Sequence, residues 1–485
     1  MTAYDIVIGL EVHSQLSTKS KLFCGCKLEF GAEPNTLVCP VCLGMPGVLP
    51  VPNRQAIEYA VRLGLATNCE INQNAMWTRK NYFYPDSPKG YQITQQGGTP
   101  EYDQPICQKG FLEVTLKNGD VKRIRINRIH MEEDAGKLTH DLSPTESHFD
   151  ANRCGTPLLE IVTEPDLKSS EEALLYLEKL KQIIEYIEVS DANMEKGNFR
   201  CDVNISLRET ENDPLGSKVE MKNMNSFSNI EKALHFEIEN QTIALDDKQV
   251  IEQVTKRYDP NKDVTVPMRS KEAAQDYRYF PEPDLLKINF VDDAFIEKIR
   301  ATMPELPEAR RHRFAGDYNL NEYDSQVLTA EKKIADYFEE VCKGITQYKL
   351  AANWIMGEVL RVVKETDSSI DELPVQSHRL AELLKLIEDK VISGKIAKQV
   401  FQEMLTSQEN PADIVDKKGL KVVADEGAIE KLVLEVIEKN PNQVAEYREG
   451  KTKLFGFFMG QIMKASQGKA STDIVTPLLR EKLAG

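Results

Sequence analysis

The sequence predicts an α+β fold, in which a large strand-rich domain precedes a helical region. Up to about residue 292, segments with apolar residues at alternate positions are separated by glycine and proline turns, which is the pattern of half-buried strands. From residue 293 the apolar residues recur at helical spacing. Because 485 residues are too many for one ordinary hydrophobic core, we expect several domains.

The first region contains several expected strand segments and one clear helix. The strand segments are residues 4–16, 111–129, 158–165, 200–209 and 218–224. The helix covers residues 169–187 and opens with Ser169 and Ser170 before two acids, as a helix N-cap requires. One face of the strand at 200–209 should be polar, because alternation places four polar side chains there: Asp202, Asn204, Ser206 and Arg208.

The second region divides at a polar stretch. Helical periodicity covers residues 326–343 and 379–405, and it resumes towards the C-terminus. Between these parts, residues 406–419 combine proline, glycine and several charges, so we expect a linker. The expected domains are therefore residues 1–292, 293–405 and 406–485.

The composition indicates a globular protein without a membrane span. Apolar residues make up 41% and charged residues 28% of the chain, and no apolar run approaches the roughly 20 residues that cross a bilayer. The N-terminus lacks a basic region and a cleavage site, so we expect a cytoplasmic protein. The net charge of -16 argues against broad electrostatic binding of nucleic acid, but residues 451–470 carry four lysines and no acid.

Four cysteines form a pattern typical of a zinc knuckle. A C-x-C pair and a C-x2-C pair, separated by a short loop, comprise Cys24, Cys26, Cys39 and Cys42. Thiolates brought together in this way suit tetrahedral Zn²⁺, and we expect structural zinc because four thiolates leave no position for water. Reduced or redox-active cysteines are the alternative.

Two segments combine histidine with acids. Residues 128–137 place His130 beside the acids at 132–134. In the expected strand at 4–16, three polar side chains share one face: Glu11, His13 and Gln15. If the two segments pack side by side, these groups can converge on one metal ion. The alternative is that the acids form a solvated turn and that His13 is an ordinary strand histidine.

Common enzyme motifs are missing from the chain. It contains neither the G-x-x-x-x-G-K-[ST] nor the G-x-G-x-x-G nucleotide motif. It also lacks a serine-rich glycine loop of the amidase kind and a convincing nucleophilic cysteine with a paired histidine. We therefore expect that the chain does not release ammonia from glutamine by itself.

Seven segments together resemble one protein family. They are YDIVIGLEVHSQL (4–16), RKNYFYPDSPKGYQITQ (79–95), RIHMEEDAGK (128–137), GTPLLEIVTEPD (155–166), RCDVNISLR (200–208), DYRYFPEPDL (276–285) and KTKLFGFFMGQIMKASQGKA (451–470). The sequence resembles the GatB/GatE family, which comprises the B subunit of the tRNA-dependent amidotransferase GatCAB and archaeal GatE. The resemblance implies a cradle domain at 1–292, a helical domain at 293–405 and a small YqeY-like tail at 406–485 that binds tRNA.

The resemblance also implies an activity. Family members use ATP to phosphorylate the side-chain carboxylate of Glu-tRNA(Gln) or Asp-tRNA(Asn), and they convert the acyl phosphate into an amide, giving Gln-tRNA(Gln) or Asn-tRNA(Asn). Phosphorylation is needed because an unmodified carboxylate has no good leaving group. The ammonia comes from the glutaminase subunit GatA through a channel, and the small subunit GatC completes a heterotrimer.

Site residues follow from the matching motifs. The resemblance implies Mg²⁺ ligands at Glu11, His13, Glu133 and Glu160, with Gln15, Glu132 and Asp202 nearby. Ligand softness alone would suit Mn²⁺ or Zn²⁺ at least as well as Mg²⁺. The end of the ammonia path is implied at Lys80, Tyr82, Lys89 and Tyr91, for which an aromatic turn packed under a loop is the alternative. Arg269 and Arg278 are candidates for binding the ATP phosphates, with surface ion pairing as the alternative.

Two other functions remain open at this point. A tRNA-binding zinc-ribbon module could act only as a scaffold, without consuming ATP. A free-standing metal-dependent ligase for a small acid would work without tRNA. The sequence leaves open which mischarged tRNA is used, which residues bind the ATP base and which metal occupies the active site.

Overall fold

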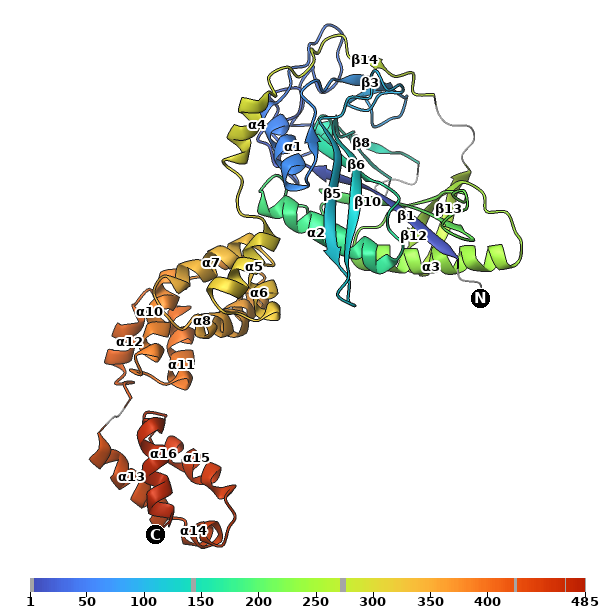
Figure 1. The fold of residues 1–485 in the computed structure, drawn as a ribbon. Coiled ribbons are helices and arrows are strands. Elements are labelled where there is room, and N and C mark those ends of the chain that lie inside the picture. Colours follow the sequence, from blue (N-terminus) through green and yellow to red (C-terminus); the bar gives the residue numbers. More distant parts are fainter. Residues whose placement is uncertain (1–3, 141–144, 271–275, 423–424, 467, 485) are drawn as a thin grey trace. The chain divides into compact units, whose positions relative to one another are not determined.

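The computed structural model describes residues 4–140, 145–270, 276–422, 425–466 and 468–484. The chain forms two compact units, Met1–Leu306 and Pro307–Gly485, whose elements are labelled in Figure 1. Helix α4 (Asp293–Arg300) belongs to the first unit, because its Phe295 and Ile299 are buried in that unit's core. The first domain was expected to end at residue 292, whereas the first unit continues through this helix.

The first unit is built on a mixed sheet of 12 strands in the described part of the chain. The main path of the sheet runs β13-β12-β11-β10-β1-β9-β6-β4-β3-β14, and β5 pairs with β6 and β2. The strands that carry the site are β1 (Asp5–Gln15), β6 (Val121–Glu133), β9 (Pro157–Thr163), β10 (Phe199–Arg208) and β11 (Val219–Lys222). The others are β2 (Glu70–Ile71), β3 (Thr78–Asn81), β4 (Tyr91–Thr94), β5 (Cys107–Thr115), β12 (Val254–Asp259), β13 (Val264–Ser270) and β14 (Phe280–Pro281). Strands β7 (Lys137–Thr139) and β8 (His148–Asp150) form a separate pair.

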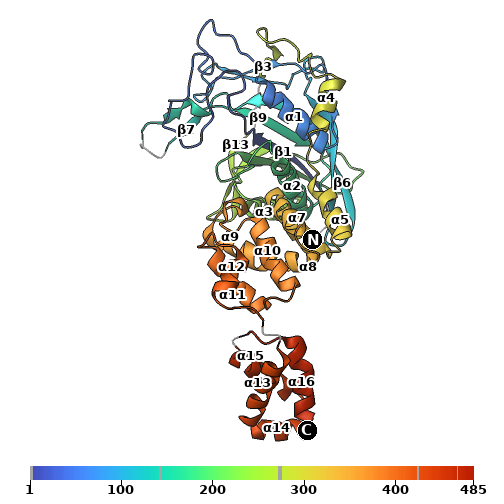
Figure 2. The same cartoon turned by 90° about the vertical axis from the view of Figure 1, so that its left-hand side faces the viewer.

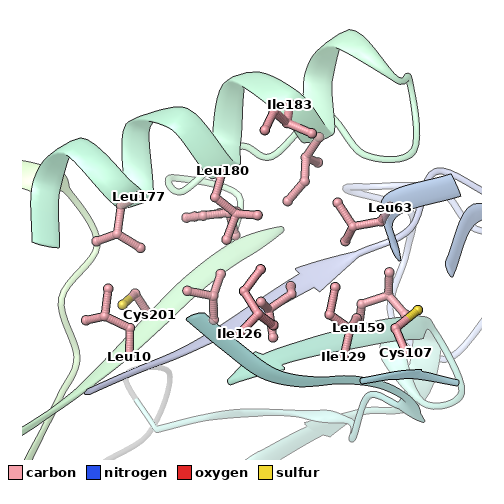
Figure 3. Packing of buried hydrophobic residues seen from close by; sticks show 14 of the residues in the cluster. Leu10, Leu63, Cys107, Ile126, Ile129, Leu159, Leu177, Leu180, Ile183 and Cys201 are labelled. Atoms are coloured by element: carbon pink, nitrogen blue, oxygen red, sulfur yellow. The ribbon is translucent and has the colours of Figure 1, made fainter. Parts of the chain in front are cut away.

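One face of the central strands is apolar and covered by helices. Helices α2 (Ser170–Tyr186) and α3 (Phe227–Asp246) lie along the same side of the sheet (Figures 1 and 2). Figure 3 shows Leu177 and Leu180 of α2 pointing toward the sheet residues Leu10, Ile126 and Leu159, all of them buried. Alternation along each strand therefore leaves the opposite face free for polar side chains.

Local sequence signals explain where the helices begin. The expected helix at 169–187 is confirmed as α2, and the Ser169 hydroxyl accepts a hydrogen bond from the Glu172 amide. Two further helices of the first unit were not expected, α1 (Arg54–Ala66) and α3. They have the same kind of start, since Asn53 caps α1 and Ser226 caps α3. These two capping residues were the sequence signals for α1 and α3, which were overlooked because the region was interpreted mainly as strands.

The second unit is helical and contains two apolar cores. The first core is formed by α5 (Pro307–Asp317), α6 (Glu322–Leu328), α7 (Lys332–Cys342), α8 (Tyr348–Trp354), α9 (Leu360–Thr366), α10 (Ser377–Glu388), α11 (Gly394–Met404) and α12 (Pro411–Lys417). The second core is formed by α13 (Glu426–Glu438), α14 (Pro441–Arg448), α15 (Leu454–Ala465) and α16 (Thr472–Ala484). None of the helices in the described ranges is long and apolar enough to span a bilayer.

The expectation of a linker at residues 406–419 is wrong for the central part of this segment. Residues 411–417 form helix α12, whose Ile414 and Val415 are buried in the first helical core. Pro411 occupies the first turn, where the missing N–H costs nothing and the fixed φ angle favours a helix. The proline that suggested a linker therefore starts a helix, and the break between the two cores follows it.

Candidate functional site

Four polar side chains form a row across neighbouring strands. His13 of β1 lies opposite Arg200 of β10 on one side and opposite Glu160 of β9 on the other. Glu160 in turn lies opposite His130 of β6. Residues directly opposite each other on antiparallel strands share a face of the sheet. The row therefore lies on the face turned away from α2.

Two histidines and three carboxylates of this face contact one another. His13 Nε2 lies 3.3 Å from Glu160 Oε2 and 3.8 Å from both Glu11 Oε1 and Glu132 Oε1. His130 Nε2 lies 3.4 Å from Glu160 Oε2 and 3.5 Å from Glu132 Oε2. We call these five residues the histidine–carboxylate cluster. Its side chains can hold a metal ion in two overlapping groups, and in each group the possible ligand atoms lie within 4.8 Å of one another.

The cluster fits a cation for a second reason. His130 is fully buried, and among the described residues its Nε2 has no partner with hydrogen-bond geometry, although carboxylate oxygens of Glu132 and Glu160 lie close to it. A buried ring nitrogen without a partner is costly. A cation between the nitrogen and the carboxylates would satisfy both kinds of ligand.

Burial and mutual charge shift the pKa values of these groups. Burial would lower the pKa of His130, but the charges of Glu160 and Glu132 outweigh it and raise the pKa to about 9. Burial also opposes ionisation of Glu160, yet the charge of His130 and the contact with His13 hold its pKa well below the usual range. Burial and the charge of Glu160 raise the pKa of Glu11. The cluster is thus a desolvated, strongly coupled set of charges, as functional sites often are.

The structure brings Glu11, His13 and Glu160 together but separates Glu133 from them. Alternation along β6 turns Glu132 towards the cluster and Glu133 to the other face. The Glu133 carboxylate forms an ion pair with Lys89 and accepts a hydrogen bond from the Ile93 amide at 3.0 Å. Glu132 therefore occupies the place beside the histidines that was expected for Glu133. From the sequence, Glu132 was expected only as a neighbour of the metal site.

The structure brings together three of the four residues expected along the ammonia path. A small cavity is lined by residues that include Tyr82, Lys89, Tyr91 and Glu133. Burial raises the pKa of Tyr82, and nearby carboxylates including Glu132 and Glu133 add to the shift. Lys80 is absent from this cavity lining, and its Nζ lies 4.9 Å from the centre of the Tyr277 ring.

Neither of the two arginines proposed for phosphate binding is a member of the five-residue cluster. Arg269 is part of β13 and pairs in register with Thr255, and its side chain lies outside the described residues. The Arg278 side chain is exposed, and its backbone adopts φ 46°. Its amide donates to Asp276 Oδ1 at 3.0 Å.

Several polar residues around the cluster were not selected from the sequence. Lys222 of β11 forms an ion pair with Asp202, which lies opposite Glu11 in the sheet register. Burial raises the pKa of Tyr279, with further contributions from Tyr277, Glu160 and Glu132, and its hydroxyl donates to Gln96 Oε1 at 3.2 Å. His130 and Glu132 had been singled out from the sequence, His130 beside the acids at 132–134 and Glu132 as a neighbour of the metal, but neither was expected as a ligand. Both lie on the face of β6 that carries the cluster.

The four expected zinc ligands converge. The Sγ atoms of Cys24, Cys26, Cys39 and Cys42 all lie within 4.8 Å of one another. Cys42 is buried and the other three are partly exposed. The amide of Cys39 donates a hydrogen bond to Cys42 Sγ at 3.2 Å. A hydrogen bond with Cys24, together with that amide and the charge of Lys21, lowers the pKa of Cys42 to about 4.

Fold and site define a two-unit protein in which a mixed-sheet domain carries a polar histidine–carboxylate face and a four-cysteine knuckle. The GatB/GatE catalytic domain family matches residues 6–297, and the GatB domain family matches residues 336–483. The chain is 54% identical to the B subunit of the aspartyl/glutamyl-tRNA(Asn/Gln) amidotransferase of Geobacter sp. (strain M21), over 99% of this chain and 100% of that protein. The protein of the same name from Caldanaerobacter subterraneus is 51% identical, over 99% of both chains. The chain therefore belongs to the GatB/GatE family.

Proposed function

We propose that this chain is the B subunit of a glutamine-dependent aspartyl/glutamyl-tRNA(Asn/Gln) amidotransferase, which is an ATP-dependent carbon–nitrogen ligase. The observation that carries the proposal is the identity of 51 to 54%, over nearly the whole chain, to relatives of that name. The location of the histidine–carboxylate cluster inside the matched catalytic domain supports it. Glu-tRNA(Gln) and Asp-tRNA(Asn) are the substrates that this function requires.

The reaction has two chemical steps. The substrate's side-chain carboxylate attacks the γ-phosphorus of ATP, ADP leaves and an acyl phosphate forms. Ammonia then attacks the acyl carbon, phosphate leaves with the electron pair of the broken C–O bond, and the nitrogen gives up one proton, which the released phosphate can take, so that the amide remains. The first step brings two anions together, so a site that performs it must neutralise charge.

The cluster is placed to meet that need. Glu11, His13 and Glu160 are the proposed ligands of Mg²⁺, and His130 and Glu132 extend the same set. When bound, Mg²⁺ would neutralise charge on the transferred phosphoryl oxygens. Histidine and carboxylate together suit Mn²⁺ or Zn²⁺ as well, so the choice of Mg²⁺ rests on the family resemblance.

Other residues have supporting roles in the proposal. Glu133 was expected as a further metal ligand, but its pairing with Lys89 supports a role in the cavity that it shares with Tyr82 and Tyr91. We place the arrival of ammonia in this cavity, with Lys80 nearby on β3. Arg269 and Arg278 remain candidate contacts of the ATP phosphates.

Zinc, partners and tRNA complete the proposal. The four cysteines Cys24, Cys26, Cys39 and Cys42 would hold structural Zn²⁺, which would cross-link the loop between β1 and α1. GatA-like and GatC-like subunits would supply ammonia and complete a cytoplasmic heterotrimer. The helices α13–α16 would contact the body of the tRNA through the lysines at 451–470, positioning the tRNA without identifying it.

The experiment is to measure ATP cleavage and amide formation by the complex of this chain with a GatA-like and a GatC-like subunit. The proposed function predicts that both activities require mischarged tRNA. A scaffold would cleave no ATP, and a small-acid ligase would keep its activity without tRNA. Either result would contradict the proposal.

A further inference from the structure

Lys21 is a buried lysine next to the zinc knuckle. Its side chain is 0% exposed, and no other lysine among the described residues is buried. Its Nζ lies 3.6 Å from Cys42 Sγ and 3.4 Å from the carbonyl oxygen of Ala151. Within the described ranges no carboxylate forms an ion pair with it. Glu133 lines the same small cavity as Lys21, but its carboxylate is paired with Lys89.

A buried ammonium needs a negative partner. Removing an isolated ammonium from water is very costly, and buried lysines are therefore paired with an anion or lose their charge. A carbonyl does not balance a full positive charge, so the counter-charge has to come from the sulfur of Cys42. Four thiolates around Zn²⁺ carry two net negative charges, because four single charges exceed the charge of the ion by two. The metal-bound state of the knuckle therefore holds a lasting negative charge beside Lys21.

The backbone holds Lys21 in this place. The Lys21 amide donates to the carbonyl of Cys26 at 3.0 Å, and the next amide, of Leu22, donates to the carbonyl of Gly155 at 2.8 Å. Lys21 is thus fixed both to the knuckle and to the loop before β9. Among the four cysteines its ammonium contacts Cys42, the buried one.

We propose that Lys21 is a positioning residue of the zinc knuckle, whose ammonium donates an N–H···S hydrogen bond to the Cys42 thiolate and balances the charge of the tetrathiolate site. The proposal rests on the proposed zinc site. The hydrogen bond withdraws electron density from the sulfur, so Cys42 is harder to protonate or alkylate and the metal is released more slowly. With reduced thiols and no metal, the alternative for this cysteine set, Lys21 would face the Cys42 sulfur alone in place of a doubly negative site.

The test compares Lys21→Met with the unaltered chain and with Lys27→Met. Methionine keeps the unbranched shape and most of the length of the side chain and removes its charge. Lys27 is a control in the same loop, with a side chain that is 68% exposed. Zinc release to an excess of chelator is measured on the full-length chain. We expect Lys21→Met to release zinc about 10- to 100-fold faster, as for other residues that support metal ligands. Lys27→Met should match the unaltered chain.

A spectroscopic measurement separates this role from a purely structural one. With Co²⁺ in place of zinc, loss of the hydrogen bond raises the energy of the sulfur electrons, so the sulfur-to-cobalt charge-transfer band should move to lower energy in Lys21→Met. Unchanged release and an unchanged band would overturn the proposal and leave the zinc site standing. An unaltered chain that binds no zinc would overturn both.

A further measurement covers the case in which Lys21→Met does not fold. Reductive methylation of lysines is followed by mass spectrometry on the unaltered chain, with zinc bound and after its removal. We expect Lys21 to be protected while zinc is bound and to be methylated once the metal is removed. Equal methylation in both states would overturn the proposal.

Discussion

Replacing Glu160 with glutamine should disable the histidine–carboxylate cluster while keeping its shape. Glu160 is the residue shared by both possible ligand groups, and its Oε2 lies 3.3 Å from His13 Nε2 and 3.4 Å from His130 Nε2. Its side chain is 7% exposed, so solvent screens its charge only weakly. The substitution removes one of the three carboxylate charges that a cation there would need.

The expected loss can be stated as a rate. Removing one strong electrostatic contact from a transition state costs on the order of 3 kcal/mol, which is a factor of roughly 10² or more in the activation step. The assay is tRNA-dependent ATP cleavage and amide formation by the complete complex with free ammonium supplied, so that delivery of ammonia does not limit the rate. Raising the concentration of Mg²⁺ or Mn²⁺ should restore part of the activity, because the site loses affinity for the ion.

The control for this prediction is Glu70→Gln. Glu70 lies in β2 of the same sheet with its side chain 67% exposed, and its partner Lys109 is also exposed. This variant should behave as the unaltered chain. If Glu160→Gln kept near-normal amidation and an unchanged metal requirement, the cluster would be structural and the active site would lie elsewhere.

Three further predictions follow from other parts of the chain. Purified protein should contain about one zinc ion, which Cys39→Ser combined with Cys42→Ser should remove, and freshly prepared protein without zinc by metal analysis would contradict this. Deleting residues 425–485 should raise KM for aminoacyl-tRNA far more than KM for ATP and flatten the salt dependence of binding, whereas equal tRNA affinity at matched salt would refute a role of the tail. Glu133→Gln should lower the free energy of unfolding by about 3 kcal/mol or more in denaturant titrations, because Lys89 loses its buried partner, with no change in metal requirement. A changed metal requirement would instead place Glu133 among the ligands.

The sequence determined the features that depend on near neighbours in the chain. The N-cap at Ser169 and the periodicity after it fixed α2, and the alternation in residues 4–16 placed Glu11 and His13 on one face of β1. The spacing of the four cysteines predicted a set that the structure brings together. These signals are local, because capping and alternation act over a few residues and a short loop keeps the two cysteine pairs close.

The tertiary structure decided which distant residues meet. The register of β9 and β6 sets Glu160 between His13 and His130, and the end of β6 turns Glu132 towards this group and Glu133 towards Lys89. A shift of one residue in that pairing would exchange the two glutamates between faces. Register depends on packing against α2 and on pairing between strands that lie far apart in sequence. No local pattern in the chain could therefore choose between Glu132 and Glu133 as the residue that faces the histidines.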